Sequence, residues 1–176
     1  ILSGRIDPLS TAFGLGALSV NTGLRNTAFG SAALEVNTTG FQNTAIGRAA
    51  LQNNTLGRDN SATGTGALQS NSIGNFNTAN GSFALNQNTT GNNNVASGVS
   101  SLNSNTTGSN NTAVGQSALF FNSVGVDNTA LGFLALNGNT DGIQNTAIGA
   151  RANVGFSNLT NVTAIGANAF VQTSNS

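Results

Sequence analysis

Residues 43–59 read Asn-Thr-Ala-Ile-Gly-Arg-Ala-Ala-Leu-Gln-Asn-Asn-Thr-Leu-Gly-Arg-Asp, and the Asn-Thr-Ala-x-Gly pattern that opens this stretch returns every 17 residues. Successive copies open at Asn26, Asn43, Asn60, Asn77, Asn94, Asn111, Asn128 and Asn145. A shortened first copy begins at Ser10 and an atypical last copy at Val162. A unit this short cannot enclose a core of its own and must stack on its neighbours. The period therefore predicts an all-β, parallel β-solenoid of about ten 17-residue coils.

The repeat also predicts the organisation of the chain. Residues 10–170 form one continuous β-solenoid repeat domain, because the pattern runs through them without a change of composition. Residues 1–9 do not fit the repeat and are expected to be an entry linker, and residues 171–176 a polar tail.

Three positions of the repeat predict the core, counting the opening Asn as position 1. Position 3 is Ala in every copy, position 8 is Ala in most, and position 9 is Leu in eight. These small and branched apolar residues should fill the coil interior. From positions 3 and 9 the predicted core is Ala28, Leu34, Ala45, Leu51, Ala62, Leu68, Ala79, Leu85, Ala113, Leu119, Ala130 and Leu136.

Two glycines in each copy predict two sharp corners. A corner needs a positive φ or a close backbone approach, and both exclude a Cβ. Position 15 is Gly from Gly40 through Gly142. Position 5 gives the predicted structural corner glycines Gly14, Gly30, Gly47, Gly64, Gly81, Gly98, Gly115, Gly132, Gly149 and Gly166. In-register stacking would also place identical Asn side chains above one another, where their amides can form ladders.

Position 4 is apolar in most copies and should face away from the position 3 alanine, because neighbours on a strand alternate between its faces. An apolar residue on both faces indicates burial on both sides. The column then either meets a partner chain or faces solvent, and the polar residues Thr63, Asn80 and Ser97 in its middle keep both interpretations open. The candidate inter-chain column is Phe29, Ile46, Val114, Leu131, Ile148 and Ile165.

The composition argues against several functional classes. The chain has five basic and five acidic residues and no net charge, so it lacks the basic stripe that nucleic-acid binding needs. No apolar run is long enough to cross a bilayer, so no membrane insertion is expected in this segment. The sequence holds no His and no Cys, which removes the usual catalytic triads. We therefore expect no enzyme, no cofactor and no repeated metal site.

Some side chains depart from the repeat. Phe120, Phe121, Phe133 and Leu134 are a candidate contact patch: they either pack locally and between subunits or contact a receptor. Arg48, Arg58 and Asp59 are close in repeat terms and are expected to form a surface ion pair.

The segments Asn145-Thr-Ala-Ile-Gly149 and Val162-Thr-Ala-Ile-Gly-Ala-Asn-Ala-Phe170 resemble the head repeats of trimeric autotransporter adhesins, the YadA-like family. Similar arrays occur in bacteriophage-type tail fibres and large surface fibre proteins. The resemblance implies a β-roll of three chains, displayed at a cell surface and used for adhesion. The repeat here is longer, through an added Asn-Thr-x-Gly side.

The leading interpretation is a structural and adhesive extracellular fibre segment at a cell surface or on a virion. Its partners would be copies of itself, as a homotrimer or an end-to-end filament, and a host-surface protein or glycan. One alternative is an ice-binding β-solenoid, because Thr27, Thr44, Thr78, Thr112, Thr129 and Thr146 form one column and Thr38, Thr55, Thr89, Thr106 and Thr140 another. The other alternative is a phage tail-fibre shaft.

Overall fold

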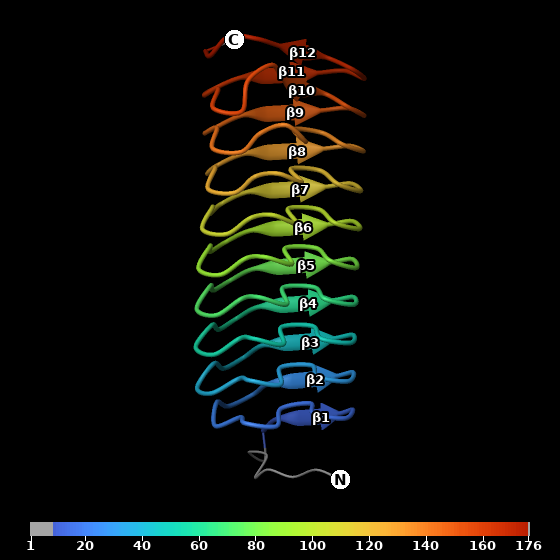
Figure 1. Cartoon of the computed structure of the whole chain (residues 1–176), viewed down its shortest axis with the longest axis vertical. Coiled ribbons are helices and arrows are strands. Elements are labelled where there is room, and N and C mark those ends of the chain that lie inside the picture. The colour runs from blue at the N-terminus through green and yellow to red at the C-terminus, as the bar shows by residue number, and fades with distance from the viewer. Residues whose placement is uncertain (1–8, 176) are drawn as a thin grey trace.

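A computed structural model describes residues 9–175 of the chain, and Figure 1 shows them as a rod of stacked coils. The expected entry linker, residues 1–9, lies outside the described residues except for Leu9. The described residues form twelve short strands, and all except two of these belong to one sheet. They are β1 (Thr11–Phe13), β2 (Thr27–Phe29), β3 (Thr44–Ile46), β4 (Ser61–Thr63), β5 (Thr78–Asn80), β6 (Val95–Ser97), β7 (Thr112–Val114), β8 (Thr129–Leu131), β9 (Thr146–Ile148), β10 (Asn153–Val154), β11 (Thr163–Ile165) and β12 (Phe170–Val171).

The main sheet is parallel and keeps one register from end to end. Its order is β1 through β9 and then β11, and each pairing sets a repeat position opposite the same position of the next copy, as in Ala28 opposite Ala45. The predicted parallel β-solenoid is thereby confirmed. The ten strands are separated by nine steps, so the described residues close about nine coils, against the ten that the repeat copies predict. At about 4.8 Å for each step the stack of strands is roughly 43 Å long.

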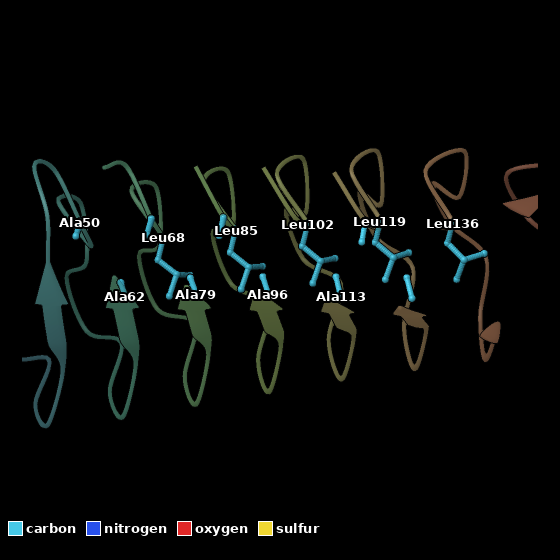
Figure 2. Close-up of a cluster of buried hydrophobic side chains, with 14 of the residues drawn as sticks. Ala50, Ala62, Leu68, Ala79, Leu85, Ala96, Leu102, Ala113, Leu119 and Leu136 are labelled. Carbon is cyan, nitrogen blue, oxygen red and sulfur yellow. The ribbon is translucent and has the colours of Figure 1, made fainter. Parts of the chain in front are cut away.

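The core is a column of alanine and leucine side chains that runs through the inside of the coils. Figure 2 shows alanines and leucines of successive coils pointing inward and lying over one another along the rod. Position 3 alanine faces position 9 leucine across the coil, and position 8 alanine lies beside it, as with Ala62, Ala67 and Leu68, all fully buried. All twelve residues of the predicted core are buried. Because each coil contributes so little apolar volume, the coil can be small enough to close in 17 residues.

The corner glycines with a following coil stacked on them occupy sites where a Cβ would strike that coil, whereas Gly166 has open space there and needs glycine for its φ of 118° alone. Gly47 has a φ of 133°, and a Cβ built on it would lie 2.6 Å from the carbonyl oxygen of Gly64 in the next coil. At position 15 the reason differs: a Cβ on Gly57 would lie 2.5 Å from the Gly74 carbonyl oxygen and would also strike the Asn54 side chain. One corner therefore needs both positive φ and close approach, and the other needs close approach alone.

Left-handed residues other than glycine are the main local feature that the sequence does not predict. Most regular coils hold three, at positions 7, 9 and 17, such as Ala49 (φ 57°), Leu51 (φ 50°) and Asp59 (φ 55°), whereas the copy that opens at Asn60 has Gly66 at position 7. A left-handed conformation costs a side chain about 1–2 kcal/mol. Full burial of the leucine contributes about 1.5–3 kcal/mol and offsets that cost. The leucine column is thus both the core of the coil and the residue that turns its backbone.

The C-terminal segment stays attached to the coil before it. Strand β12 pairs in parallel with β10, and the Asn175 amide donates to the Thr160 carbonyl at 3.0 Å. The described part of the expected polar tail, residues 171–175, therefore continues the hydrogen bonding of the rod.

Candidate functional site

Two asparagine ladders run through the inside of the rod at the position 15 corner. At position 1, the Asn43 backbone N–H donates to Asn26 Oδ1 at 3.0 Å, and Asn43 Nδ2 donates to the Gly57 carbonyl at 2.8 Å. At position 12, Asn54 Nδ2 donates to Asn37 Oδ1 at 2.7 Å and to the same Gly57 carbonyl at 3.0 Å. Both columns are fully or almost fully buried from Asn26 to Asn145.

The ladders provide hydrogen-bond partners for the asparagine amides and glycine carbonyls that are buried beside the narrow apolar core. Among residues 9–175 no buried side-chain nitrogen or oxygen lacks a hydrogen-bond partner. Satisfied buried amides contribute to stability, whereas unsatisfied ones are costly. A β-solenoid held by stacked asparagine ladders fits a repeat structural protein.

The second threonine column, at position 13, is part of this internal bonding. The Thr55 hydroxyl donates to the Ser72 carbonyl at 3.0 Å, and the Thr89 hydroxyl donates to the Thr106 carbonyl at 3.0 Å. Each of these hydroxyls uses its one proton on the next coil. The position 13 column is half-buried at a corner of the coil. The position 2 threonines differ in location, because they lie on the outer face of the strands.

The outer face of the main sheet is formed by positions 2 and 4. Every apolar member of the position 4 column is exposed in the single chain: Phe29 43%, Ile46 44%, Val114 37%, Leu131 47%, Ile148 38% and Ile165 67%. Phe13 extends the column, and its ring stacks on Phe29 at 5.9 Å. Neither column holds a charged residue in any of the ten strands. This surface is an uncharged sheet face with apolar ends and a polar middle.

The candidate contact patch consists of two pairs in the structure. The rings of Phe120 and Phe121 meet edge to face at 4.7 Å, and Phe121 is half exposed. The Phe133 ring lies under the Arg151 guanidinium at 5.5 Å, and Leu134 is half-buried with a φ of 56°. Within residues 9–175 no ring contact joins Phe133 to the other two phenylalanines.

The expected ion pair of Arg48, Arg58 and Asp59 does not form, so this prediction is wrong. In the described part of the chain these side chains make no ion pair. The Arg58 guanidinium instead lies over two aromatic rings, Phe41 and Phe76, each 5.6 Å away. Arg58 sits at position 16, and the rings come from position 16 of the coil before and position 17 of the coil after. The contact of Arg58 with the two rings could be predicted only by noting that residues at positions 16 and 17 of successive coils lie over one another.

Acidic residues are spread along the rod. Asp59 and Asp127 share position 17 but lie four coils apart, which is roughly 19 Å at the ladder spacing. Among the described residues no three His, Cys, Asp or Glu side chains are grouped so that they could hold a metal ion.

No helix within residues 9–175 has the length and apolar character needed to cross a membrane. Comparison of the chain with protein-family models and with curated proteins finds no match.

Proposed function

We propose that this chain is a non-catalytic structural segment of an extracellular fibre, at a cell surface or on a virion, and that it attaches surfaces to one another. The observation that carries the proposal is the combination of two buried asparagine ladders with an uncharged outer sheet face. The ladders make a stiff rod, and the outer face repeats the same groups at fixed spacing. Repetition converts weak contacts into useful avidity.

The position 4 column supports self-association. Its seven apolar members, with the exposed fractions given above and 71% for Phe13, present about 600 Å² of apolar side chain if a fully exposed one presents roughly 150–200 Å². A stable interface buries about 800 Å² on each partner. With the flanking position 2 threonines the column approaches that area. We place copies of this chain on it, three in the assembly that the resemblance implies.

Mass measurement in solution, by native mass spectrometry and sedimentation, tests self-association. The wild-type chain is expected as a trimer. Ile46→Ser and Leu131→Ser together should give monomers with an unchanged far-UV circular dichroism spectrum. The matched control is Leu56→Ser with Val124→Ser, exposed apolar positions on another side of the coil. A monomeric wild-type chain at all concentrations would remove this part of the proposal.

Attachment is tested separately, with beads that carry the chain and with cells or extracellular-matrix surfaces. Beads with the wild-type chain should be retained, and beads with an unrelated β-solenoid of similar length should not. Equal retention of the two kinds of bead would count against an adhesive role.

Ice binding is the second candidate because the position 2 threonines face outward at the ladder spacing. Their neighbours at position 4 are bulky and apolar at both ends of the rod, and the position 13 hydroxyls are already bonded internally. Thermal hysteresis of a concentrated solution distinguishes the two functions: measurable hysteresis favours ice binding, and its absence with a trimer mass favours the fibre. A tail-fibre shaft would have the same geometry as the fibre.

A further inference from the structure

An arginine lies over two aromatic rings at one corner of the rod. The chain leads from this corner into strands β3 to β5, which Figure 1 labels. The guanidinium carbon of Arg58 lies 5.6 Å from the centroids of both Phe41, in the coil before, and Phe76, in the coil after. The Arg58 backbone N–H donates to Asn75 Oδ1 at 3.0 Å, which ties its own backbone to the next coil. Two rings close to the guanidinium favour its charged form and restrict the rotation of the long side chain.

The charged group of this stack is not neutralised. Arg58 is exposed, and within residues 9–175 it forms no ion pair. Asp59 follows it in the chain and brings one negative charge to the corner, whereas Arg25, at the same corner two coils earlier, brings a second positive charge. The guanidinium carbon lies over the rings, and its N–H groups are left to bind a ligand. A planar fork of N–H groups matches a carboxylate with two parallel hydrogen bonds.

A pocket adjoins the stack through the shared Phe41 side chain. It has a volume of about 250 Å³ and is lined by Thr22, Gly23, Leu24, Arg25, Thr39, Phe41 and Gln42. These residues come from the first two coils only, so the pocket lies on the side of Phe41 toward the first coil. Its lining combines an aromatic ring and a leucine with hydroxyl, amide and guanidinium groups.

The pocket arises because the first coil is one residue shorter than the others. The chain reads Asn21-Thr-Gly-Leu-Arg25 where the next coil reads Asn37-Thr-Thr-Gly-Phe-Gln42. In the second coil three successive N–H groups, from Thr38 to Gly40, donate to the Thr55 carbonyl, whereas in the first coil only Thr22 and Gly23 donate to Thr38. The shorter corner leaves space beside the Phe41 ring.

From this arrangement we propose that the corner formed by Arg25, Phe41, Arg58 and Phe76 binds a carboxylate-bearing sugar, the acidic residue of a glycan. Arg58 takes the carboxylate, and the pocket takes the neighbouring sugar ring. The apolar face of that ring packs on Phe41 and Leu24, and its hydroxyls bond to Thr39 and Gln42. A sugar hydroxyl also donates to the Thr22 hydroxyl oxygen, whose own proton is bonded to the Thr38 carbonyl. An acidic peptide would use the arginines but not these hydroxyl and amide groups. The inference rests on the proposed adhesive function and names a ligand class for it.

The experiment titrates the full chain with an oligosaccharide of uronic acids and, separately, with the same oligosaccharide after its carboxyl groups are reduced to alcohols. Isothermal titration calorimetry gives the dissociation constants, and NMR shifts of the backbone amides locate the contact. We expect the acid form to bind, the reduced form to bind at least 10-fold more weakly, and the shifts to centre on residues 22–25, 39–42 and 58. Absence of binding, or equal binding of both forms, would overturn the proposal.

Three variants sharpen the test. Arg58→Gln should weaken binding of the acid form at least 10-fold, since a charge-assisted bidentate contact is lost. Asp59→Asn should strengthen binding about 2- to 5-fold by removing a like charge. Arg151→Gln is the matched control, because Arg151 lies over a single ring at 5.5 Å near the other end of the rod, and it should change nothing. Equal loss in the Arg58 and Arg151 variants would mean a general charge effect and would overturn the site.

Two further arms distinguish the glycan site from a peptide site and from a loss of fold. A glutamate-rich peptide that bound as tightly as the acid oligosaccharide, with the same loss in Arg58→Gln, would show a peptide site and not a glycan site. Melting curves of each variant show that the fold is intact, with wild-type values expected because Arg58 and Arg151 are exposed and Asp59 is only half-buried. The bead-attachment assay with Arg58→Gln then distinguishes the two proposals: attachment that survives without uronate binding leaves the adhesive function standing and removes only this site.

Discussion

Replacing one ladder asparagine tests whether the buried amides hold the rod together. Asn71 lies near the middle of the rod and is fully buried. Its Nδ2 donates to Asn54 Oδ1 at 2.7 Å and to the Gly74 carbonyl at 3.0 Å, and its Oδ1 accepts from Asn88 Nδ2 at 2.8 Å. Asn71→Ala removes all three bonds at once.

The expected cost follows from what each partner keeps. The Gly74 carbonyl still accepts from Asn60 Nδ2, and Asn88 Nδ2 still donates to Gly91, so these two partners lose one bond of two. Asn54 Oδ1 loses the ladder bond that Asn71 supplied. Three lost bonds at about 0.5–1.5 kcal/mol each, and one buried acceptor left without its partner at about 1–3 kcal/mol, give a destabilisation of roughly 2.5–7.5 kcal/mol.

Thermal unfolding followed by far-UV circular dichroism measures this cost. For a chain of this size 1 kcal/mol corresponds to about 2–4 °C, so Asn71→Ala should lower Tm by roughly 5–30 °C. The control is Asn53→Ala, an exposed asparagine one position before the ladder, which should shift Tm by less than about 2 °C. If the two variants melt together, the ladder bonds contribute no net stability and the reasoning fails.

Other predictions concern the corners and the core. Gly47→Ala should cost about 3 kcal/mol or more, because its φ of 133° suits glycine alone and a Cβ would meet the Gly64 carbonyl; chemical denaturation measures it, and a loss below about 1 kcal/mol would contradict the corner geometry. Ala49→Gly should be neutral or stabilise the chain by up to about 1 kcal/mol, because Ala49 has a φ of 57° that glycine adopts without strain. A clear decrease in Tm would show that the left-handed backbone costs alanine nothing at this position. Leu85→Ala should lower the free energy of unfolding by about 2–5 kcal/mol, because it leaves a cavity in the stacked core. Ile73→Ala, at an exposed position, is the control, and equal losses of stability in the two variants would argue against a core role for Leu85.

The sequence predicts the parts of the fold that depend on period. Because Ala28, Ala45 and Ala62 recur at one spacing, stacking in register is the only arrangement that buries them all, and the strand pairing follows. The glycine corners and asparagine ladders follow from the same constant positions. These features are insensitive to side-chain detail, since they need only that like residues lie over like.

Features that depend on backbone conformation or on differences between copies are not predictable in this way. Leucine rarely adopts a positive φ, so the value of 50° at Leu51 has no signal in the residue itself. The Thr55 hydroxyl bond depends on the orientation of one side chain at a corner. The pocket beside Phe41 follows from a single missing residue in the first coil, and its lining depends on how the two corners fold against each other. The partner of the position 4 column remains a prediction, because a single chain leaves that column exposed.

The ladders also give the rod an electrical direction. In the position 12 column the amide nitrogen of each asparagine from Asn37 to Asn139 donates toward the preceding coil, as Asn71 does to Asn54, and its oxygen accepts from the coil that follows. In the position 1 column the oxygen likewise accepts from the next coil, through the backbone N–H of the next asparagine, as Asn26 Oδ1 does from Asn43. The side-chain dipoles therefore add, with N–H groups directed to the β1 end and oxygens to the β11 end. Two such rods stacked end to end with the β11 end of one on the β1 end of the other would bring opposite partial charges into contact. Two rods that meet through the same end would bring like partial charges together and repel.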